Sequence, residues 1–314
     1  MAITAAQVKE LRDITGAGMM ACKKALAATD GDMDKAVEFL REQGLAGAEK
    51  KAGRIAAEGV SFAKVSEDMH TGVVVEVNAE TDFVAKNAKF QAYVDQVCDQ
   101  ALTTTAADID AFLDEKWDLD ETRTVAEQLS EEISIIGENM HIRRFHKLVE
   151  NEGLVSAYIH AGGRIGVILQ VKSDVVNDAV AEMAKNIAMQ IAALNPKYTT
   201  RAEVDQEYLA HETAILTEAA KNEKPNAPEK VLNGMVQGRL NKELKEICLV
   251  DQTYVKAEDG KQTVQQYVDS VAKAQGAKIS LVTFVRYETG EGLEKKSEDF
   301  AAEVAAQQAA AKKN

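Results

Sequence analysis

At Gly72-Val73-Val74-Val75-Glu76-Val77 the apolar pattern of this chain takes the period of a β-strand. A similar run, Val60-Ser61-Phe62-Ala63-Lys64-Val65, precedes it across a polar turn. Two runs of this kind around a turn predict a pair of strands. From about Phe83 to Leu102 the period is helical, and the apolar face of the expected helix consists of Phe90, Val94, Val97 and Ala101.

The same order of elements returns in the second half of the chain. Strands are expected at 154–159 and 165–171 around the turn His160-Ala161-Gly162-Gly163, and the helix that follows carries Val180, Met183, Ile187 and Ile191. At an offset of 94 residues, Gly72-Val73 falls on Gly166-Val167. We therefore predict an α+β fold with a duplicated core and antiparallel sheets, made of residues 58–150 and of residues 151–196 with 248–288.

Residues 1–57 have a helical pattern and a nearly balanced charge, with nine basic and eight acidic side chains. Thr4 and Gln7 form the sequence of a capping box that starts a helix with Val8, Leu11 and Ile14 on its apolar face. A second helix is expected through Cys22 and Leu26, and Asp32 is expected to cap a third. The stretch from Gly44 to Arg54, which contains Lys50 and Lys51, suggests a basic linker. We predict a separate three-helix module.

The second copy of the core is interrupted by residues 197–247. Asn195-Pro196 is expected to end the preceding helix, and two amphipathic helices then follow around a loop that contains Pro225 and Pro228. This pattern predicts a helical hairpin of the coiled-coil type. Residues 289–314 form a last module, with an alanine-rich helix expected from Ser297.

The composition excludes several classes of protein. The 314 residues include 51 acidic and 37 basic side chains, a formal net charge of −14. Proteins that hold nucleic acid need clustered positive charge, so we expect no direct nucleic-acid partner. No apolar run approaches the ~20 residues that span a bilayer, and the first residues lack a signal-peptide pattern. We therefore expect a cytoplasmic protein without a membrane partner.

The sequence lacks the patterns of covalent catalysis. There is no phosphate-binding loop of the G-x-x-x-x-G-K-[ST] type, and the glycines from Gly162 to Gly166 precede a strand rather than a helix. On a helix, His141 and His146 would lie on different faces, and no cysteine has a partner at metal-ligand spacing. We expect no enzyme activity, no cofactor and no metal site. The ten acidic residues within 104–132 are expected on a solvated helical surface.

Two longer stretches carry a specific resemblance. They are Leu11-Arg12-Asp13-Ile14-Thr15-Gly16-Ala17-Gly18-Met19-Met20-Ala21-Cys22-Lys23-Lys24-Ala25-Leu26 and Glu76-Val77-Asn78-Ala79-Glu80-Thr81-Asp82-Phe83-Val84-Ala85-Lys86-Asn87. Both closely resemble the signature motifs of the bacterial translation elongation factor Ts family, the guanine nucleotide exchange factors of elongation factor Tu. The resemblance covers nearly the whole chain. One departure is Gln190, which stands where many members have histidine.

The resemblance implies both a fold and an activity. Members of the family have an N-terminal three-helix domain similar to ubiquitin-associated domains, a two-subdomain core, a coiled-coil insertion and a C-terminal helical module. They bind elongation factor Tu in its GDP form, disturb its phosphate loop and Mg²⁺ site, release GDP and hold the nucleotide-free form until GTP binds. This chain is therefore expected to act in the elongation phase of protein synthesis.

The resemblance also implies which residues act on Mg²⁺. The tetrapeptide Thr81-Asp82-Phe83-Val84 is expected to dislocate Mg²⁺ from the partner, and its place between a strand and a helix favours exposure. The alternative is that Thr81 or Asp82 only caps the helix while Phe83 packs in the core. At the 94-residue offset this sequence is replaced by Val175-Val176-Asn177-Asp178, so the scaffold alone does not require it.

Two further groups resemble the family's contacts to its partner. The first consists of Leu11, Arg12, Met19 and Met20, where exposed methionine would adapt to a partner surface. The second consists of His160, Gly162, Gly163 and Arg164. The alternative for the first group is that one of its methionines is simply part of the core. The alternative for the second is that His160 only makes hydrogen bonds within its own turn.

Other interpretations stay open at this stage. A non-catalytic scaffold would bind a partner without changing the release rate of a nucleotide, and a hydrolase using residues 104–132 would turn over a substrate. The sequence also leaves open whether the hairpin forms a homodimer, and which roles Gln190 and Lys50-Lys51 have.

Overall fold

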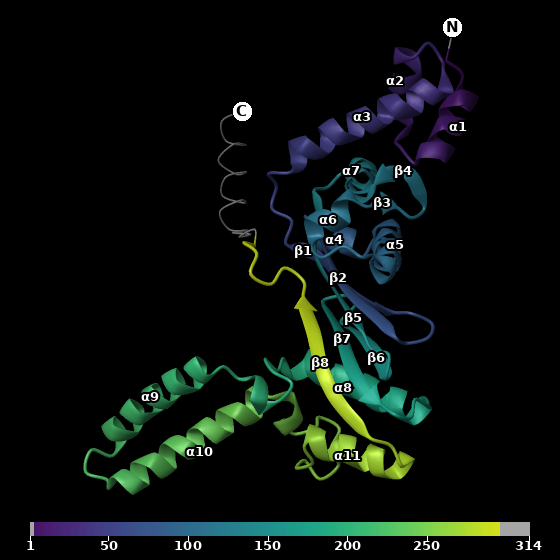
Figure 1. The fold of residues 1–314 in the computed structure, drawn as a ribbon. Coiled ribbons are helices and arrows are strands. Elements are labelled where there is room, and N and C mark those ends of the chain that lie inside the picture. The colour runs from purple at the N-terminus through teal and green to yellow at the C-terminus, as the bar shows by residue number, and fades with distance from the viewer. Residues whose placement is uncertain (1–2, 296–314) are drawn as a thin grey trace, which may run out of the picture.

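The computed structural model describes residues 3–295, and Figure 1 shows a mixed architecture of helices and sheets. Within this range there are eleven α-helices, two three-stranded sheets and one two-stranded sheet. All strand pairs within these sheets are antiparallel. The predicted α+β class is confirmed. The helix expected from Ser297 lies outside the described residues.

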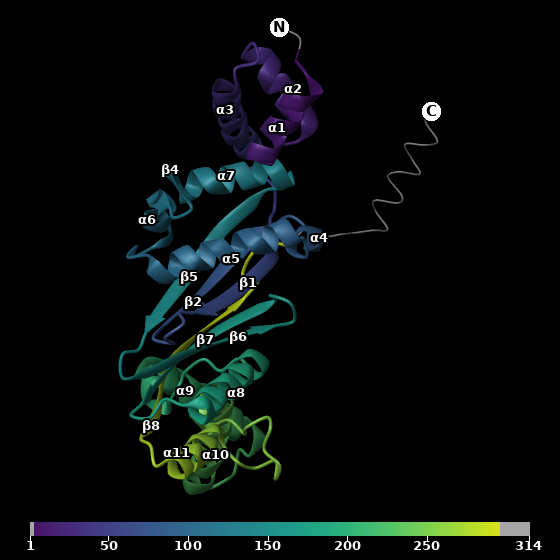
Figure 2. The ribbon, with the colours of Figure 1, turned by 90° about the vertical axis from the view of Figure 1, so that its right-hand side faces the viewer.

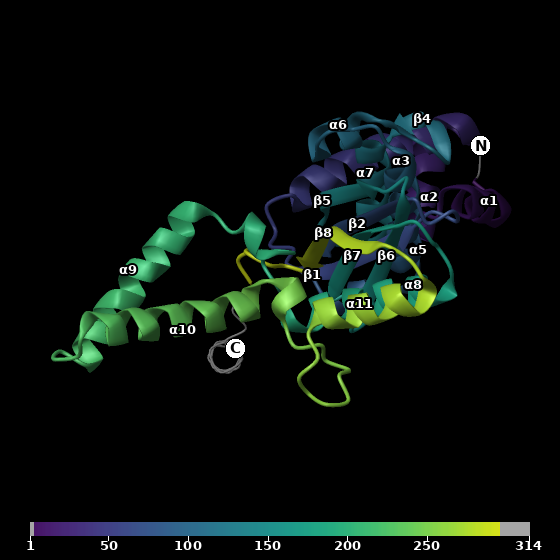
Figure 3. The same cartoon turned by 60° about the horizontal axis from the view of Figure 1, so that its bottom comes forward.

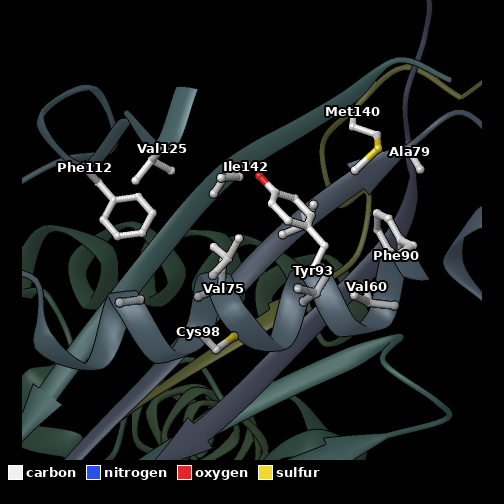
Figure 4. Close-up of a cluster of buried hydrophobic side chains, with 14 of the residues drawn as sticks. Val60, Val75, Ala79, Phe90, Tyr93, Cys98, Phe112, Val125, Met140 and Ile142 are labelled. Atoms are coloured by element: carbon white, nitrogen blue, oxygen red, sulfur yellow. The ribbon is translucent and has the colours of Figure 1, made fainter. Parts of the chain in front are cut away.

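The first large sheet has the strand order β1-β2-β5. Its strands are β1 (Glu58–Val65), β2 (Thr71–Ala79) and β5 (Met140–Val149). Helix α5 (Ala88–Thr103) covers one face, and Figure 4 shows its Phe90 and Tyr93 among the side chains buried with Val75 and Ile142 of the strands. Between α5 and β5 the chain forms α6 (Ile109–Asp114), β3 (Lys116–Trp117), β4 (Asp120–Thr124) and α7 (Val125–Ile136).

The second large sheet repeats this design with the order β6-β7-β8. Its strands are β6 (Gly153–His160), β7 (Ile165–Ser173) and β8 (Ile279–Glu288). Helices α8 (Asp178–Leu194) and α11 (Val264–Gln275) cover one face, where Met183 and Ile187 are buried with Val167 and Leu169. Figure 2 shows the two sheets lying against each other, with α5 and α7 on one side and α8 and α11 on the other.

The two sheets share backbone details at equivalent positions. Each has a register shift at the same point, between Glu76 and Val77 in one and between Gln170 and Val171 in the other. Gly59 and Gly153 also correspond, and a Cβ atom on either would overlap the carbonyl oxygen of Val77 or Val171. The 94-residue offset therefore relates irregular features as well as regular strands, as an internal duplication predicts.

Glycines allow the two sheets to approach closely. A Cβ atom on Gly166 would lie 2.7 Å from the carbonyl oxygen of Ser61, and one on Gly72 would overlap the side chain of Val155. These contacts are equivalent under the duplication, because Ser61 and Val155 also differ by 94 positions. Around them lies an apolar layer made of Ala63, Val74, Leu148, Val155 and Ile168.

A buried carboxylate joins the first sheet to the end of the second. Glu76 is fully buried and accepts hydrogen bonds from Arg143 Nη1 at 3.1 Å, Arg144 Nε at 2.6 Å and the backbone nitrogen of Gly290 at 2.8 Å. Arg144 also lies over the ring of Tyr287, 4.0 Å from its centre. A buried charge is tolerated only when it is paired and hydrogen-bonded, as this one is.

The N-terminal helices are α1 (Ala5–Thr15), α2 (Met19–Ala28) and α3 (Met33–Lys51). The predicted capping box of Thr4 with Gln7 and the cap by Asp32 are confirmed. The expected linker is wrong in most of its length, because α3 continues to Lys51. The helix continues there because it packs on α7, where a Cβ atom on Gly44 would lie 3.6 Å from Ser134.

Three other expectations need correction. The helix predicted from Phe83 to Leu102 is divided into α4 (Asp82–Ala85) and α5, because the side chain of Asn87 accepts from the Lys89 nitrogen and caps α5. Residues 104–132 are not simply a helical surface, since β3 and β4 bury Trp117 there. His141 and His146 lie on strand β5 and not on a helix.

The two helices expected within 197–247 are present as α9 (Gln206–Glu223) and α10 (Glu229–Ile247). Figure 3 shows them projecting together away from the sheets. The base of this hairpin is an apolar cluster that contains Val204, Leu244 and Cys248. Short 3₁₀ turns, Arg201–Glu203 and Leu249–Asp251, connect the hairpin to the second sheet and its helices.

Substitution of Gly166 by alanine is expected to destabilise the contact between the sheets. The added methyl group would displace the Ser61 backbone, and overpacking of this kind costs about 1–3 kcal/mol of unfolding free energy. Urea unfolding followed by fluorescence of Trp117, the one tryptophan of the chain, measures the effect. The control is Gly234→Ala on the exposed side of α10, which should leave the Trp117 transition unchanged. An unchanged midpoint for Gly166→Ala would contradict the packing argument.

Candidate functional site

The tetrapeptide Thr81–Val84 forms the turn from β2 into α4. Thr81 is the N-cap of α4, and its Oγ1 atom accepts from the Val84 nitrogen at 3.3 Å. The same hydroxyl donates to Oε1 of Glu138 at 2.7 Å, while the Thr81 backbone nitrogen donates to Oε2 at 3.0 Å. Thr81 therefore caps the helix, as the alternative interpretation held.

Phe83, however, does not pack in the core. Its side chain is 81% exposed, so the second half of that alternative is wrong. Asp82 beside it is also exposed, and a hydrogen bond from Lys86 Nζ at 2.6 Å lowers the pKa of its carboxyl group from the usual value. Burial of a phenylalanine side chain is worth about 1.5–3 kcal/mol, and the contacts of Phe83 within this chain leave most of that gain unrealised.

The other end of the turn is anchored in the first core. Val84 packs against this core and Ala85 is buried in it. The side chain of Gln91 donates to the Ala85 carbonyl oxygen at 3.2 Å, which fixes the exit of the turn. Asp82 and Phe83 thus stand on a short segment that is held on both sides. A hollow of about 430 Å³ lies beside them, lined also by Ile55, Ala57, Glu58, Glu80 and Lys295.

The second predicted contact lies in the turn between β6 and β7. His160 and Arg164 are exposed, and His160 Nδ1 lies 3.2 Å from the Tyr158 hydroxyl. Gly163 is buried instead, and a Cβ atom on it would lie 2.7 Å from the Val60 side chain. Its carbonyl oxygen accepts from the Ser61 nitrogen at 2.6 Å. Gly163 therefore joins the turn to β1, while His160 and Arg164 face outward.

These contacts bring the two turns to one edge of the molecule. Val60 and Ser61 lie near the start of β1, where Glu58 pairs with Ala79 just before the Thr81 turn. Figure 2 shows α4 and the β6–β7 turn projecting to the same side. The fold thus places together two segments that the sequence analysis identified separately.

The N-terminal group is divided between core and surface. Leu11 is fully buried in the three-helix core, so it supports the module and offers no surface. Arg12 and Met19 are exposed, and Met20 is 76% exposed. Ile14 was expected on the buried face but is 61% exposed. Its helical spacing from Leu11 gave no sign of this exposure.

Residues 3–295 contain no cluster of three or more histidine, cysteine, aspartate or glutamate side chains arranged to hold a metal ion. In the same range, no helix has the length and apolar character that crossing a membrane requires.

Comparison with known proteins adds a direct assignment. A family model described as elongation factor Ts matches residues 80–291, more than half of the chain. The elongation factor Ts of Clostridioides difficile (strain 630) is 50% identical over 305 residues, which are 97% of this chain and 98% of that protein. That of Clostridium novyi (strain NT) is 49% identical over 302 residues, 96% of this chain and 97% of that protein. The chain belongs to the elongation factor Ts family.

The part matched by the elongation factor Ts model includes both turns. Thr81–Val84 and His160–Arg164 lie within residues 80–291, whereas the exposed methionines of α2 lie before it. The matches to whole elongation factor Ts proteins leave only a few residues of this chain uncovered, so they take in most of the N-terminal module as well.

Gln190, the departure noted in the sequence analysis, is held by hydrogen bonds inside the protein. It is fully buried in α8, and its Nε2 atom donates to Gln252 at 3.1 Å and to the Thr253 carbonyl oxygen at 3.0 Å. Its Oε1 atom accepts from the Val255 nitrogen at 2.8 Å. All of these partners belong to the same half of the core, so Gln190 fixes the segment after α10.

Truncation of Leu11 and of Met20 should separate core from surface in the N-terminal module. Leu11→Ala removes a fully buried side chain and is expected to destabilise the module by about 2–5 kcal/mol. Met20→Ala should change stability by less than about 0.5 kcal/mol. Hydrogen exchange of the amides in α1 and α2 measures both changes. Equal protection in the two variants would contradict the assignment of Leu11 to the core.

Proposed function

We propose that this protein is a guanine nucleotide exchange factor for elongation factor Tu, without covalent chemistry of its own. It binds the GDP form, disturbs the phosphate loop and the Mg²⁺ site, releases GDP and holds the nucleotide-free form until GTP binds. Membership of the elongation factor Ts family supports this activity. The observation that carries the mechanism is the exposure of Phe83 on a turn that is fixed at both ends.

Exchange of this kind follows from linkage between two binding sites. An exchange protein that binds the nucleotide-free partner more tightly than the loaded partner must weaken nucleotide binding. The ratio of the two affinities is the same in both directions. A thousandfold faster release corresponds to about 4 kcal/mol if the whole difference appears in dissociation. No catalytic group on the factor is needed, which agrees with the catalytic patterns missing from the sequence.

Phe83 and Asp82 suit the role of a wedge. A GTPase holds its nucleotide through a phosphate-binding loop and a Mg²⁺ ion. The phenyl ring gains free energy when it leaves water and enters the partner, and this gain can offset the displacement of partner side chains around the ion. Asp82 brings a negative charge to the same place. Because α4 and the core hold the turn, the insertion does not require the turn to reorganise.

The other exposed residues supply binding. Met19, Met20 and Arg12 present an adaptable apolar surface with a positive charge, which we assign to the nucleotide-binding domain of the partner. His160 and Arg164 are assigned to a second partner domain. Two separate contacts orient the partner so that Phe83 meets the Mg²⁺ site.

The proposal includes the division of the chain. Residues 1–57 would act as a module similar to ubiquitin-associated domains, residues 58–150 and 151–196 with 248–288 as the two core subdomains, 197–247 as a coiled-coil insertion and 289–314 as a C-terminal module. The site of action is the cytoplasm, and the partner is a protein rather than a nucleic acid.

Phe83→Ala is expected to lower the maximal rate of GDP release from elongation factor Tu by about tenfold or more, equal to ~1.4 kcal/mol of lost assistance. Stopped-flow fluorescence of a labelled GDP at saturating factor measures this rate. The control is Val176→Ala, which truncates an exposed apolar side chain in the corresponding turn of the second subdomain and should leave the rate unchanged. If neither the wild type nor the variant accelerates GDP release, the protein would instead be a scaffold that binds a partner without changing nucleotide release.

Met20→Ala and His160→Ala should change binding rather than the maximal rate. Each removes an exposed contact residue that is not part of the Thr81–Val84 turn itself, so the concentration for half-maximal GDP release is expected to rise by about tenfold. Titration of the factor against loaded elongation factor Tu gives both parameters. Leu119→Ala, an exposed residue between β3 and β4, is the control. A lower maximal rate of GDP release with an unchanged half-saturating concentration would contradict the assignment of these residues to binding.

A further inference from the structure

Two carboxylates form a reciprocal contact at the base of the Phe83 turn. Glu80 Oε1 accepts from the backbone nitrogen of Asn139 at 2.6 Å. Glu138, the residue before Asn139, accepts from the backbone nitrogen of Thr81, the residue after Glu80. The carboxylate of Glu80 thus binds the backbone of the pair Glu138-Asn139, and the carboxylate of Glu138 binds the backbone of the pair Glu80-Thr81. Charged acceptors make these hydrogen bonds stronger than bonds between neutral groups.

The second core subdomain shows which half of this contact the scaffold needs. Met140 pairs with Ala79, as Ile279 pairs with Ser173, so Asn139 corresponds to Lys278 and Glu80 to Asp174. The backbone nitrogen of Lys278 donates to Asp174 Oδ1 at 2.7 Å. The contact between Glu80 and Asn139 is therefore present in both subdomains, and it ties the end of the second strand to the start of the third.

The Glu138 half exists only in the first subdomain. By the same correspondence, Ala277 stands at the position of Glu138 and Val175 at that of Thr81. The side chain of alanine has no hydrogen-bond acceptor, and that of valine has no hydroxyl group. The Val175 backbone nitrogen instead donates to the Ser173 hydroxyl at 3.3 Å. The second subdomain forms its turn without such a carboxylate. The Glu138 contact is thus found only in the copy whose turn carries an exposed phenylalanine.

We propose that Glu138 is a positioning residue for nucleotide exchange, which holds the Thr81 turn so that Phe83 is aimed at the partner. This inference rests on the proposed exchange function. Glu138 binds both the nitrogen and the hydroxyl of Thr81, and that hydroxyl in turn accepts from the Val84 nitrogen. One side chain therefore fixes both sides of Asp82-Phe83. A site held by supporting hydrogen bonds loses less entropy on binding than a mobile one.

The test is the maximal rate of GDP release from elongation factor Tu with Glu138→Ala. The rate is expected to fall by about tenfold while the half-saturating concentration stays within about twofold, since Met20 and His160 still bind. Glu138→Gln keeps one acceptor oxygen and should give an intermediate rate. Hydrogen exchange should be faster at the Thr81 and Val84 amides of the Ala variant.

The matched control is Glu203→Ala. Glu203 binds the nitrogen of Thr199 and both the nitrogen and the hydroxyl of Thr200, so it makes the same kind of contact at the base of the hairpin. Its removal should cost similar stability but leave the maximal rate unchanged. In a Phe83→Ala background, Glu138→Ala should have no further effect on the rate, because both changes remove one function.

The outcomes separate the two proposals. No acceleration by the wild-type protein would overturn the proposed function itself. Acceleration by wild type and its loss in Phe83→Ala, with a normal rate for Glu138→Ala, would overturn only the positioning role. Equal losses of the maximal rate in Glu138→Ala and Glu203→Ala would assign the effect to general destabilisation and would overturn the positioning role. Fully additive rate losses from Glu138→Ala and Phe83→Ala would overturn it as well.

Discussion

The close approach of the two sheets decides where the turns of this protein can lie. Gly166 and Gly72 stand where any side chain would meet the opposite sheet, and Gly163 stands where the β6–β7 turn crosses Val60. Because the sheets meet at backbone distance, the Ser61 nitrogen can bond to the Gly163 carbonyl oxygen. This bond brings the His160 turn to the same edge as Phe83. With a wider spacing between the sheets, this hydrogen bond could not form and the Phe83 and His160 turns would not be held together.

Buried polar groups give this arrangement one register. The hydroxyls of Ser61 and Thr289 lie 3.0 Å apart, and Thr289 also donates to the Gly163 carbonyl oxygen at 3.0 Å. Together with the bonds of Glu76 to Arg144 and Gly290, they tie the segment after β8 to the first sheet. Apolar packing alone tolerates small slips, whereas a buried polar atom without its partner costs about 1–3 kcal/mol. These contacts therefore select a single fit between the two halves.

Local side-chain signals predicted several elements, but not every such signal was recognised: helix α11, which begins with a capping box at Thr263, was not predicted. The caps at Thr4 and Asp32 and the strands around Gly72 follow from side-chain chemistry within a few residues. Strand β5 was missed because Arg143 and Arg144 interrupt its alternation, and both pair with the buried Glu76 on the neighbouring strand, which local sequence does not reveal. The length of α3 was missed because its C-terminal part, rich in Lys and Gly, is held by α7, more than 80 residues away.

For the candidate site, residue identity and spacing were enough to indicate the family, the duplicated core and the Thr81–Val84 motif. That Phe83 is exposed while Leu11 and Gly163 are buried became apparent from the folded chain. Burial depends on which surfaces meet, and those surfaces come from distant parts of the chain. The role of Glu138 is of the same kind: its acceptor atoms reach Thr81 across 57 positions, a pairing that no local pattern encodes.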